Sequence, residues 1–227
     1  MLSGYRQLAA ERELQGIPPL PLNAEQTQDL TLLLEEPPSK EEEEELLYLL
    51  KERIPPGVDE AAYVKATWLS AIAQSSNKSK LVSPLEATQL LGTMIGGYNV
   101  GALIELLEND DKDIANCAAN GLSHTLLVYD AVNDILNLSK KNKFAEKVIQ
   151  NWASGKWFTS KKPLAERIIV TIFKVDGETN TDDLSPATHA TTRPDIPLHA
   201  LAMLESRDPH ALNTIKDLKQ KGHPIAY

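Results

Sequence analysis

Apolar side chains recur every three or four positions along residues 1–155, which is the spacing of one face of an α-helix. Within residues 23–35 the leucines follow this spacing, and Pro37 and Pro38 end the helix that they predict. The same rhythm returns after each short polar turn. The first two thirds of the chain therefore predict helix after helix.

The sequence also predicts where some of these helices begin and end. Ser83 and Glu86 have the spacing of a capping box, and Pro84 occupies the first helical position between them. The helix that they open is expected to stop at Gly96 and Gly97. Short helices joined by short turns favour stacked helical pairs, so we expect a mainly α fold built on an α-solenoid of the HEAT type.

The pattern changes near residue 160. Residues 168–175, IIVTIFKV, are rich in β-branched side chains and predict a largely buried strand. The final HPIAY also resembles a strand, and the sequence offers it no obvious partner. We therefore predict a helical domain over residues 1–158 and an incomplete α/β domain over residues 159–227.

The charge is spread unevenly between these parts. The net charge is −9, and residues 161–227 are neutral, so the whole excess lies before residue 161. An acidic first part disfavours non-specific binding of nucleic acid, although it leaves room for a local basic patch. The run of glutamates at 41–45 fits the first turn of a helix, where the dipole favours negative charge; a cation site is the alternative.

Targeting signals are not evident in the sequence. No apolar run reaches the roughly 18 to 20 residues that span a bilayer, and the N-terminus lacks the pattern of a signal peptide. Cys117 is the only cysteine, so it cannot form an internal disulfide. These features predict a cytoplasmic protein.

Polar side chains are densest in NTDDLSP, residues 180–186, which follows the predicted strand. Such residues bond readily to nearby backbone, so the stretch could simply form a turn. Alternatively, it forms a site, because ligands of α/β folds bind at the carboxyl ends of strands. Arg193 would then add a planar donor suited to a carboxylate.

Longer motifs carry a specific resemblance. FKVDGETNTDDLSPA and RPDIPLHALAML resemble the swivel domain of the aconitase B family. Further family-like stretches cover the rest of the chain, namely IPPGVDEAAYVKA, LLGTMIGGYN, GLSHTLL and KGHPIAY. The resemblance implies a HEAT-like domain followed directly by the start of a swivel domain.

This resemblance also implies an activity. Aconitases are hydro-lyases of the tricarboxylic acid cycle that interconvert citrate and isocitrate through cis-aconitate, and some members act on 2-methylisocitrate. A [4Fe–4S] cluster with one open iron position binds the substrate in this family. By the family pattern, Asp182 orients a catalytic histidine from another domain, Ser185 lies near the substrate, and Arg193 clamps a substrate carboxylate. The pattern gives Asp183 no role.

Other parts of the family's active site are not found in this sequence. The catalytic serine and the three cluster cysteines of the family lie beyond the position of Tyr227. We therefore expect this chain alone neither to bind the cluster nor to catalyse. Cys117 is expected to be a small buried residue, and His124 a buried core histidine, in preference to a ligand role for either.

A second hypothesis belongs to another class. Stacked helices offer extended surfaces for partners, so the chain could be a stand-alone interaction module. In this family the helical domain is linked to homodimers and to binding of mRNA. The acidic charge of residues 1–160 favours protein partners over RNA.

Overall fold

The computed structural model describes residues 1–125 and 128–226. Leu126 and Leu127 of the GLSHTLL motif and Tyr227 of HPIAY lie outside the described residues. The contacts divide the chain into two compact units, which are described separately. The first unit comprises residues 1–2 and 21–162, and the second comprises residues 3–20 and 163–227.

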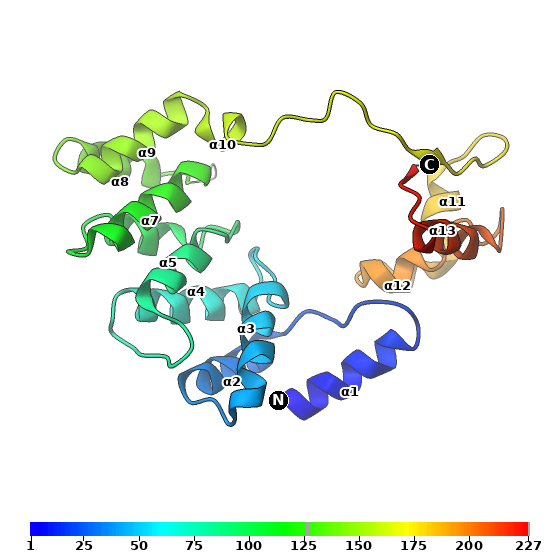
Figure 1. The fold of residues 1–227 in the computed structure, drawn as a ribbon, viewed down its shortest axis with the longest axis horizontal. Helices are drawn as coiled ribbons and strands as arrows, with labels where there is room; N and C mark the ends of the chain where they lie inside the picture. The colour runs from blue at the N-terminus through cyan, green and yellow to red at the C-terminus, as the bar shows by residue number, and fades with distance from the viewer. Residues whose placement is uncertain (126–127, 227) are drawn as a thin grey trace. The chain divides into compact units, whose positions relative to one another are not determined.

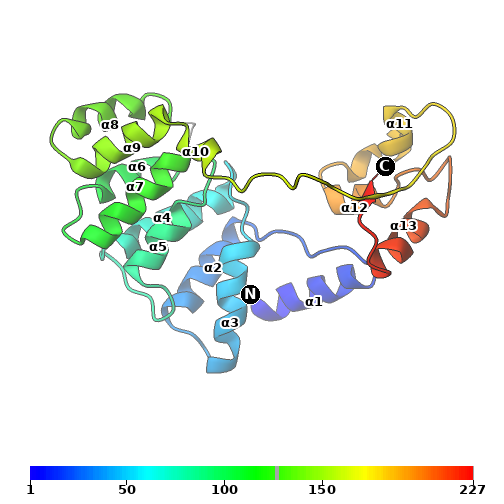
Figure 2. The same ribbon diagram turned by 45° about the horizontal axis from the view of Figure 1, so that its top comes forward.

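The first unit is a stack of helices. In this unit α2, α4, α5, α7 and α9 contact one another in that order, as Figures 1 and 2 show. Its elements are α2 (Ala24–Glu35), η1 (Lys40–Glu42), α3 (Glu43–Glu52), α4 (Glu60–Ala73), α5 (Pro84–Leu91), α6 (Val100–Leu106), α7 (Lys112–His124), α8 (Ala131–Ser139), α9 (Lys143–Ala153) and α10 (Lys156–Thr159). The prediction of a mainly α fold is confirmed.

Local capping explains where several of these helices begin. Ser83 accepts a hydrogen bond from the backbone N–H of Glu86, and the Glu86 carboxylate accepts one from the N–H of Ser83. The hydrogen bonds that the Glu86 carboxylate accepts from the N–H and the hydroxyl of Ser83 lower its pKa below its ordinary value. Asn23 and Gln26 form the same reciprocal pair at the start of α2. The capping box predicted at Ser83 is confirmed, although α5 ends at Leu91, earlier than expected.

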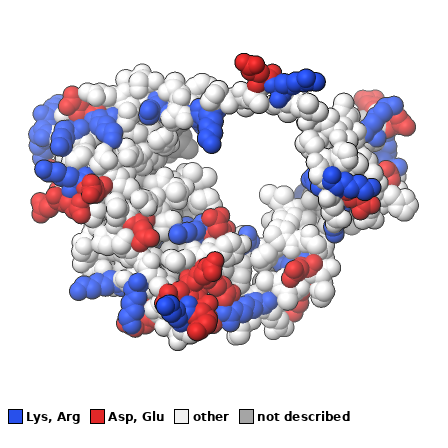
Figure 3. Space-filling model, in the orientation of Figure 1, with Lys and Arg blue, Asp and Glu red and all other residues white. Residues whose placement is uncertain are grey.

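The glutamate run lies where a helix start would place it. Residues 41–45 occupy η1 and the first turn of α3. Figure 3 shows acidic side chains gathered over the region of α2 and α3, and basic ones over α8 and α9. Among the described residues no group of three or more His, Cys, Asp or Glu side chains could hold a metal ion. Nor is any described helix long and apolar enough to cross a membrane.

The second unit begins with the N-terminal helix. Its elements are α1 (Leu2–Glu13), β1 (Thr171–Ile172), α11 (Thr181–Leu184), η2 (Ala187–Thr192), α12 (Ile196–Ala200), α13 (Ala211–Gln220) and β2 (Ile225–Ala226). Arg12 of α1 forms a two-pronged ion pair with Asp195, with N–O distances of 2.5 and 2.9 Å. The predicted boundary near residue 158 stays a prediction, but these contacts group the first helix with residues 163–227.

The expected buried strand is wrong in both length and burial. Of residues 168–175 only Thr171 and Ile172 form a strand, and the side chains of Ile168 and Ile172 are 69% and 74% exposed. A strand needs neighbours on its edges and on its faces. The only partner of β1 in the described part of the chain is the two-residue β2.

The C-terminal segment does find a partner, contrary to expectation. Thr171 lies opposite Ile225 and Ile172 opposite Ala226, in parallel register. In addition, the backbone N–H of Thr171 donates to the carbonyl of Pro224 at 2.6 Å. The sequence could not indicate this pairing because the paired positions lie 54 positions apart and nothing local specifies it.

Candidate functional site

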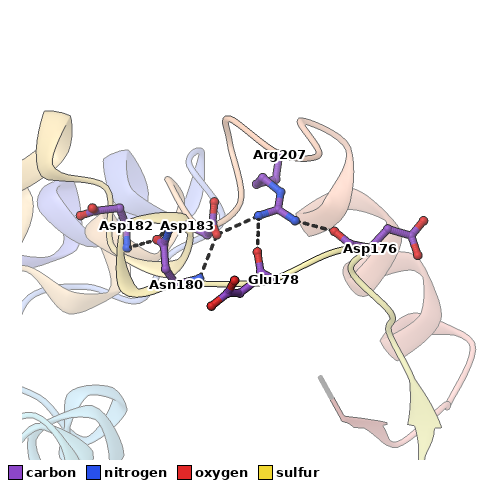
Figure 4. A network of polar contacts seen from close by, with 6 residues as sticks. All are labelled: Asp176, Glu178, Asn180, Asp182, Asp183 and Arg207. Atoms are coloured by element: carbon purple, nitrogen blue, oxygen red, sulfur yellow. Dashed lines mark hydrogen bonds and ion pairs between the residues drawn. The ribbon is translucent and has the colours of Figure 1, made fainter.

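The dense polar stretch folds into a capped turn of helix, α11. The Asn180 side chain accepts hydrogen bonds from the backbone N–H groups of Asp182 and Asp183. In return, the Asp183 carboxylate accepts from the N–H of Asn180 at 3.0 Å. This is a capping box with aspartate in place of the usual glutamate, and it fixes both aspartates on one short helix (Figure 4).

Asp183 is the structural carboxylate of the pair. It is 7% exposed and accepts a hydrogen bond from Arg207 at 3.0 Å. The same guanidinium donates to the carbonyls of Asp176 and Glu178, so it ties the chain before α11 to α11 itself (Figure 4). Gly177 allows this approach because its φ of +81° suits glycine and Arg207 lies where a side chain would stand.

Asp182 has the opposite surroundings. Its side chain is exposed, and Figure 4 shows the carboxylate pointing away from Arg207. Its backbone N–H bonds to Asn180, whereas its carboxylate forms no hydrogen bond or ion pair within the described residues. Of the two adjacent aspartates, therefore, only Asp182 is available to a partner outside the turn.

Ser185 is joined to a histidine that the sequence motifs did not single out as a site residue. Its Oγ lies 2.8 Å from Nε2 of His199, which is on α12. The other ring nitrogen, Nδ1, lies 2.8 Å from Oγ1 of Thr192 at the end of η2. All three side chains are partly buried. The imidazole thus bridges two hydroxyl groups from two different elements.

Arg193 directly follows Thr192, so the hydrogen bond between Thr192 and His199 fixes the start of its backbone. Its side chain is exposed and makes no hydrogen bond or ion pair within the described part of the chain. Two residues later, Asp195 caps α12 by accepting from the N–H of Leu198 at 3.2 Å. The hydrogen bonds from Arg12 hold the pKa of Asp195 below its ordinary value.

Cys117 and His124 lie in the first unit, away from this cluster. Burial raises the pKa of the half-buried Cys117 thiol, which disfavours the thiolate that a metal binds. His124 is exposed and bonds to the carbonyl of Asn120 and to Ser160, so the expectation of a core histidine is wrong. His124 occupies the last turn of α7, where its ring can turn toward solvent. With one cysteine in the sequence, these residues do not fit a [4Fe–4S] cluster.

The structure therefore brings part of the predicted site together. Ser185 and the backbone of Arg193 are linked through His199 and Thr192, while Asp182 lies on the neighbouring α11. Sequence reasoning missed the roles of the remaining residues, namely Arg12, Asp183, Thr192, Asp195, His199 and Arg207. The spacing of Asn180 and Asp183 was a local signal, because it is the spacing of a capping box.

Two family profiles match nearly all of the chain. The profile described as "Aconitate B N-terminal domain" matches residues 4–158. The profile described as "Aconitate hydratase 2 N-terminus" matches residues 170–227. The gap between them, residues 159–169, includes the exposed segment that precedes β1.

Curated relatives agree with these profiles. Aconitate hydratase B of Synechocystis sp. is 62% identical over 227 residues, which are 100% of this chain and 26% of that protein. The proteins of the same name from Pseudomonas aeruginosa and Escherichia coli are each 52% identical over 238 residues, covering 100% of this chain and 27% of each relative. The chain thus spans about a quarter of the length of the relatives it matches.

Proposed function

The chain belongs to the aconitate hydratase B family, and we propose that it forms one wall of the substrate site of a hydro-lyase. The reaction is the interconversion of citrate and isocitrate through cis-aconitate. Both acids carry three carboxylates and one hydroxyl group. A wall for such a ligand needs a donor for carboxylates and groups that recognise a hydroxyl.

One observation carries this proposal. The uncommitted guanidinium of Arg193 follows directly on Thr192, whose hydroxyl is joined through His199 to that of Ser185. The nearby arginines Arg12 and Arg207 are already bound to aspartates. Arg193 therefore has its planar donors free for a carboxylate, which they can bind in two-pronged fashion.

Asp182 has the role that fits an exposed carboxylate on a fixed turn. We propose that it accepts a hydrogen bond from a histidine supplied elsewhere in the complete enzyme and so orients that ring. Asp183 cannot take this role, because its carboxylate is committed to Asn180 and Arg207. The capping box holds Asp182 at a defined angle while leaving its side chain exposed.

The family's cluster supplies Lewis-acid chemistry toward the substrate when it is bound. The residues of this chain do not fit the cluster, so we assign them other roles in the reaction. Arg193 binds a carboxylate, Ser185 contacts the hydroxyl, and Asp182 orients a base.

A chimera tests the proposal. The matching N-terminal part of the Synechocystis enzyme is replaced by these 227 residues, and citrate-to-isocitrate conversion is measured. We expect an active chimera. Arg193→Lys keeps the charge but removes the planar fork, so we expect kcat/KM to fall about tenfold or more.

Arg167→Lys is the matched control, because Arg167 is also exposed and lies in the same unit. It should leave kcat/KM within about twofold. A folded, cluster-loaded chimera without activity, or an equal loss from both substitutions, contradicts the proposal.

Finer properties stay predictions. They are activity on 2-methylisocitrate, a homodimer through the helical unit, binding of RNA, and a cytoplasmic location. The basic side chains over α8 and α9 are the part of the first unit on which an RNA contact would have to rest.

A further inference from the structure

The hydrogen-bond chain around His199 has a direction that can be read from proton counting. Thr192 has one hydroxyl proton, and it donates this proton to the carbonyl of His189 at 2.8 Å. A carbonyl oxygen can only accept, so no proton remains on Thr192 for His199. At the 2.8 Å contact between Thr192 and His199, the ring nitrogen Nδ1 must therefore be the donor.

That assignment fixes the other side of the ring. A neutral imidazole carries one N–H, and here it is at Nδ1, so Nε2 has a free lone pair. Ser185 lies 2.8 Å from Nε2 and must donate its own proton to it. The order of donation then runs from Ser185 through His199 and Thr192 to the carbonyl of His189.

This order decides what Ser185 can offer to a ligand. With its only proton directed at His199, its oxygen presents lone pairs alone, so it can accept a hydrogen bond but cannot donate one. Arg193 is the reverse, because a guanidinium donates and never accepts. A hydroxy acid suits the two together, with its O–H on Ser185 and a carboxylate on Arg193.

We infer that His199 is a positioning residue that holds Ser185 as an acceptor for the substrate's hydroxyl group. This inference rests on the proposed function, and it makes that function more specific. It assigns recognition of the hydroxyl to Ser185 and recognition of a carboxylate to Arg193. An acid that lacks the hydroxyl, such as tricarballylate, gains nothing from Ser185.

His124 provides an internal comparison. Its Nδ1 lies 2.9 Å from the carbonyl of Asn120, so it too carries its proton at Nδ1, but its Nε2 lies 3.3 Å from Ser160. It is an exposed residue of the first unit and has no part in the proposed site. His124→Gln is therefore a matched control for substitutions of His199.

The first experiment needs no ligand. Nitrogen-15 NMR of the imidazole rings of this chain, above the pH at which they titrate, distinguishes the two neutral forms. We expect His199 to carry its proton at Nδ1, and Thr192→Val to weaken that preference. A proton at Nε2 of His199 in the unmodified chain overturns the inference, because Ser185 would then be free to donate.

The second experiment uses the active chimera. His199→Gln places an amide oxygen near the position of Nε2, so it can still accept from Ser185. His199→Asn reaches only the position of Nδ1 and leaves Ser185 without its acceptor. We expect His199→Asn to raise the KM for citrate about fivefold while the inhibition constant of tricarballylate stays within twofold. His199→Gln and His124→Gln should both stay near the parent values.

The outcomes separate the two proposals. If His199→Asn weakens citrate and tricarballylate by the same factor, His199 has only a structural role and the inference is wrong, although the proposed function stands. If the unmodified chimera is folded and inactive, the proposed function is wrong, and the NMR result still decides the direction of the Ser185 proton.

Discussion

The two units of this chain are held together in different ways. The first unit buries leucines from nearly every helix, and Leu30, Leu49 and Leu103 are all 0% exposed. Each helix contacts a near neighbour in sequence, such as α4 with α5 and α8 with α9. In a stack of this kind each helix buries its apolar face against the next, so local sequence patterns largely specify the fold.

The second unit has few buried apolar side chains and relies on polar contacts between distant residues. Its buried apolar side chains among the described residues are Tyr5, Ile17, Ala202, Leu204, Ala211 and Ile215. Arg12 reaches Asp195 across 183 positions, and Arg207 reaches Asp183 across 24. The comparison shows that the unit with the candidate site is the one whose structure depends on partners that a local pattern cannot reveal.

The largest expected effect tests the apolar core of the first unit. Leu103→Ala in α6 should lower the free energy of unfolding by about 3 kcal/mol, because it leaves a cavity in a fully buried position. Urea denaturation followed by circular dichroism measures the change. Leu32→Ala in α2 is the control, since that side chain is 60% exposed and should cost well under 1 kcal/mol.

This contrast explains which parts of the fold could be predicted. The capping box at Ser83 and the helix that follows depend on residues a few positions apart, and both are present. The prediction of a strand over residues 168–175 was wrong because β-branched side chains give only a preference for strand structure. Whether they form a strand depends on neighbours far away in sequence, and here β2 pairs with just Thr171 and Ile172.

A buried lysine gives the next effect, which depends on pH. Lys65 is 2% exposed and donates to the carbonyl of Leu50 at 2.7 Å, and burial lowers its pKa to about 8. In the unfolded chain a lysine stays protonated up to about pH 10.4. Between these values the unfolded state binds more protons, so stability rises with pH, by roughly 3 kcal/mol in total.

The measurement compares urea unfolding of the parent chain and of Lys65→Met from pH 7.5 to 10.5. The difference in stability between them should shift in favour of the parent as pH rises. Lys80→Met should leave the pH slope unchanged, because Lys80 is exposed. A parent chain whose pH slope matches that of Lys65→Met would contradict the prediction.

A smaller effect tests the ion pair of the second unit. Asp195→Asn keeps a side chain that can cap α12 but removes the charge that pairs with Arg12. We expect the melting temperature of this unit to fall by about 5 °C near neutral pH. Asp176→Asn should have little effect, since the ion pair of Asp176 with Lys174 is exposed.

The pH dependence of that effect follows from the lowered pKa of Asp195. The pair stabilises fully above the unfolded value, which is about 3.9 for aspartate, and the contribution is lost as pH falls through the folded value. The gap in stability between the parent and Asp195→Asn should therefore narrow as pH falls below about 4 and close once pH is below the folded pKa of Asp195. A gap that persists there would mean that the substitution acts through packing instead of charge.

The candidate site follows the same division between local and distant information. Asp182, Ser185 and Arg193 came from a motif, and their roles stay predictions. The sequence assigned nothing to Asp183, although its box with Asn180 is local. His199 lies 14 positions from Ser185 and 7 from Thr192, so only the folded chain places its two nitrogens between their hydroxyls.

The smallest effect asks whether the two units unfold separately. Gly101 in α6 and Gly4 in α1 belong to different units, and a methyl group added at either meets no atom within 4 Å. Replacing a helical glycine with alanine stabilises by up to about 1 kcal/mol, less near a helix start. Each substitution should therefore raise the melting temperature of its own unit by a few degrees at most.

Calorimetry of the two variants resolves this. If only the transition of the first unit moves in Gly101→Ala, and only that of the second in Gly4→Ala, the units are independent and α1 stabilises the second. If both move a single shared transition, the units unfold together. The sparse core of the second unit would then depend on the helical stack for its stability, and the polar contacts of Arg12 and Arg207 would serve mainly to shape the site.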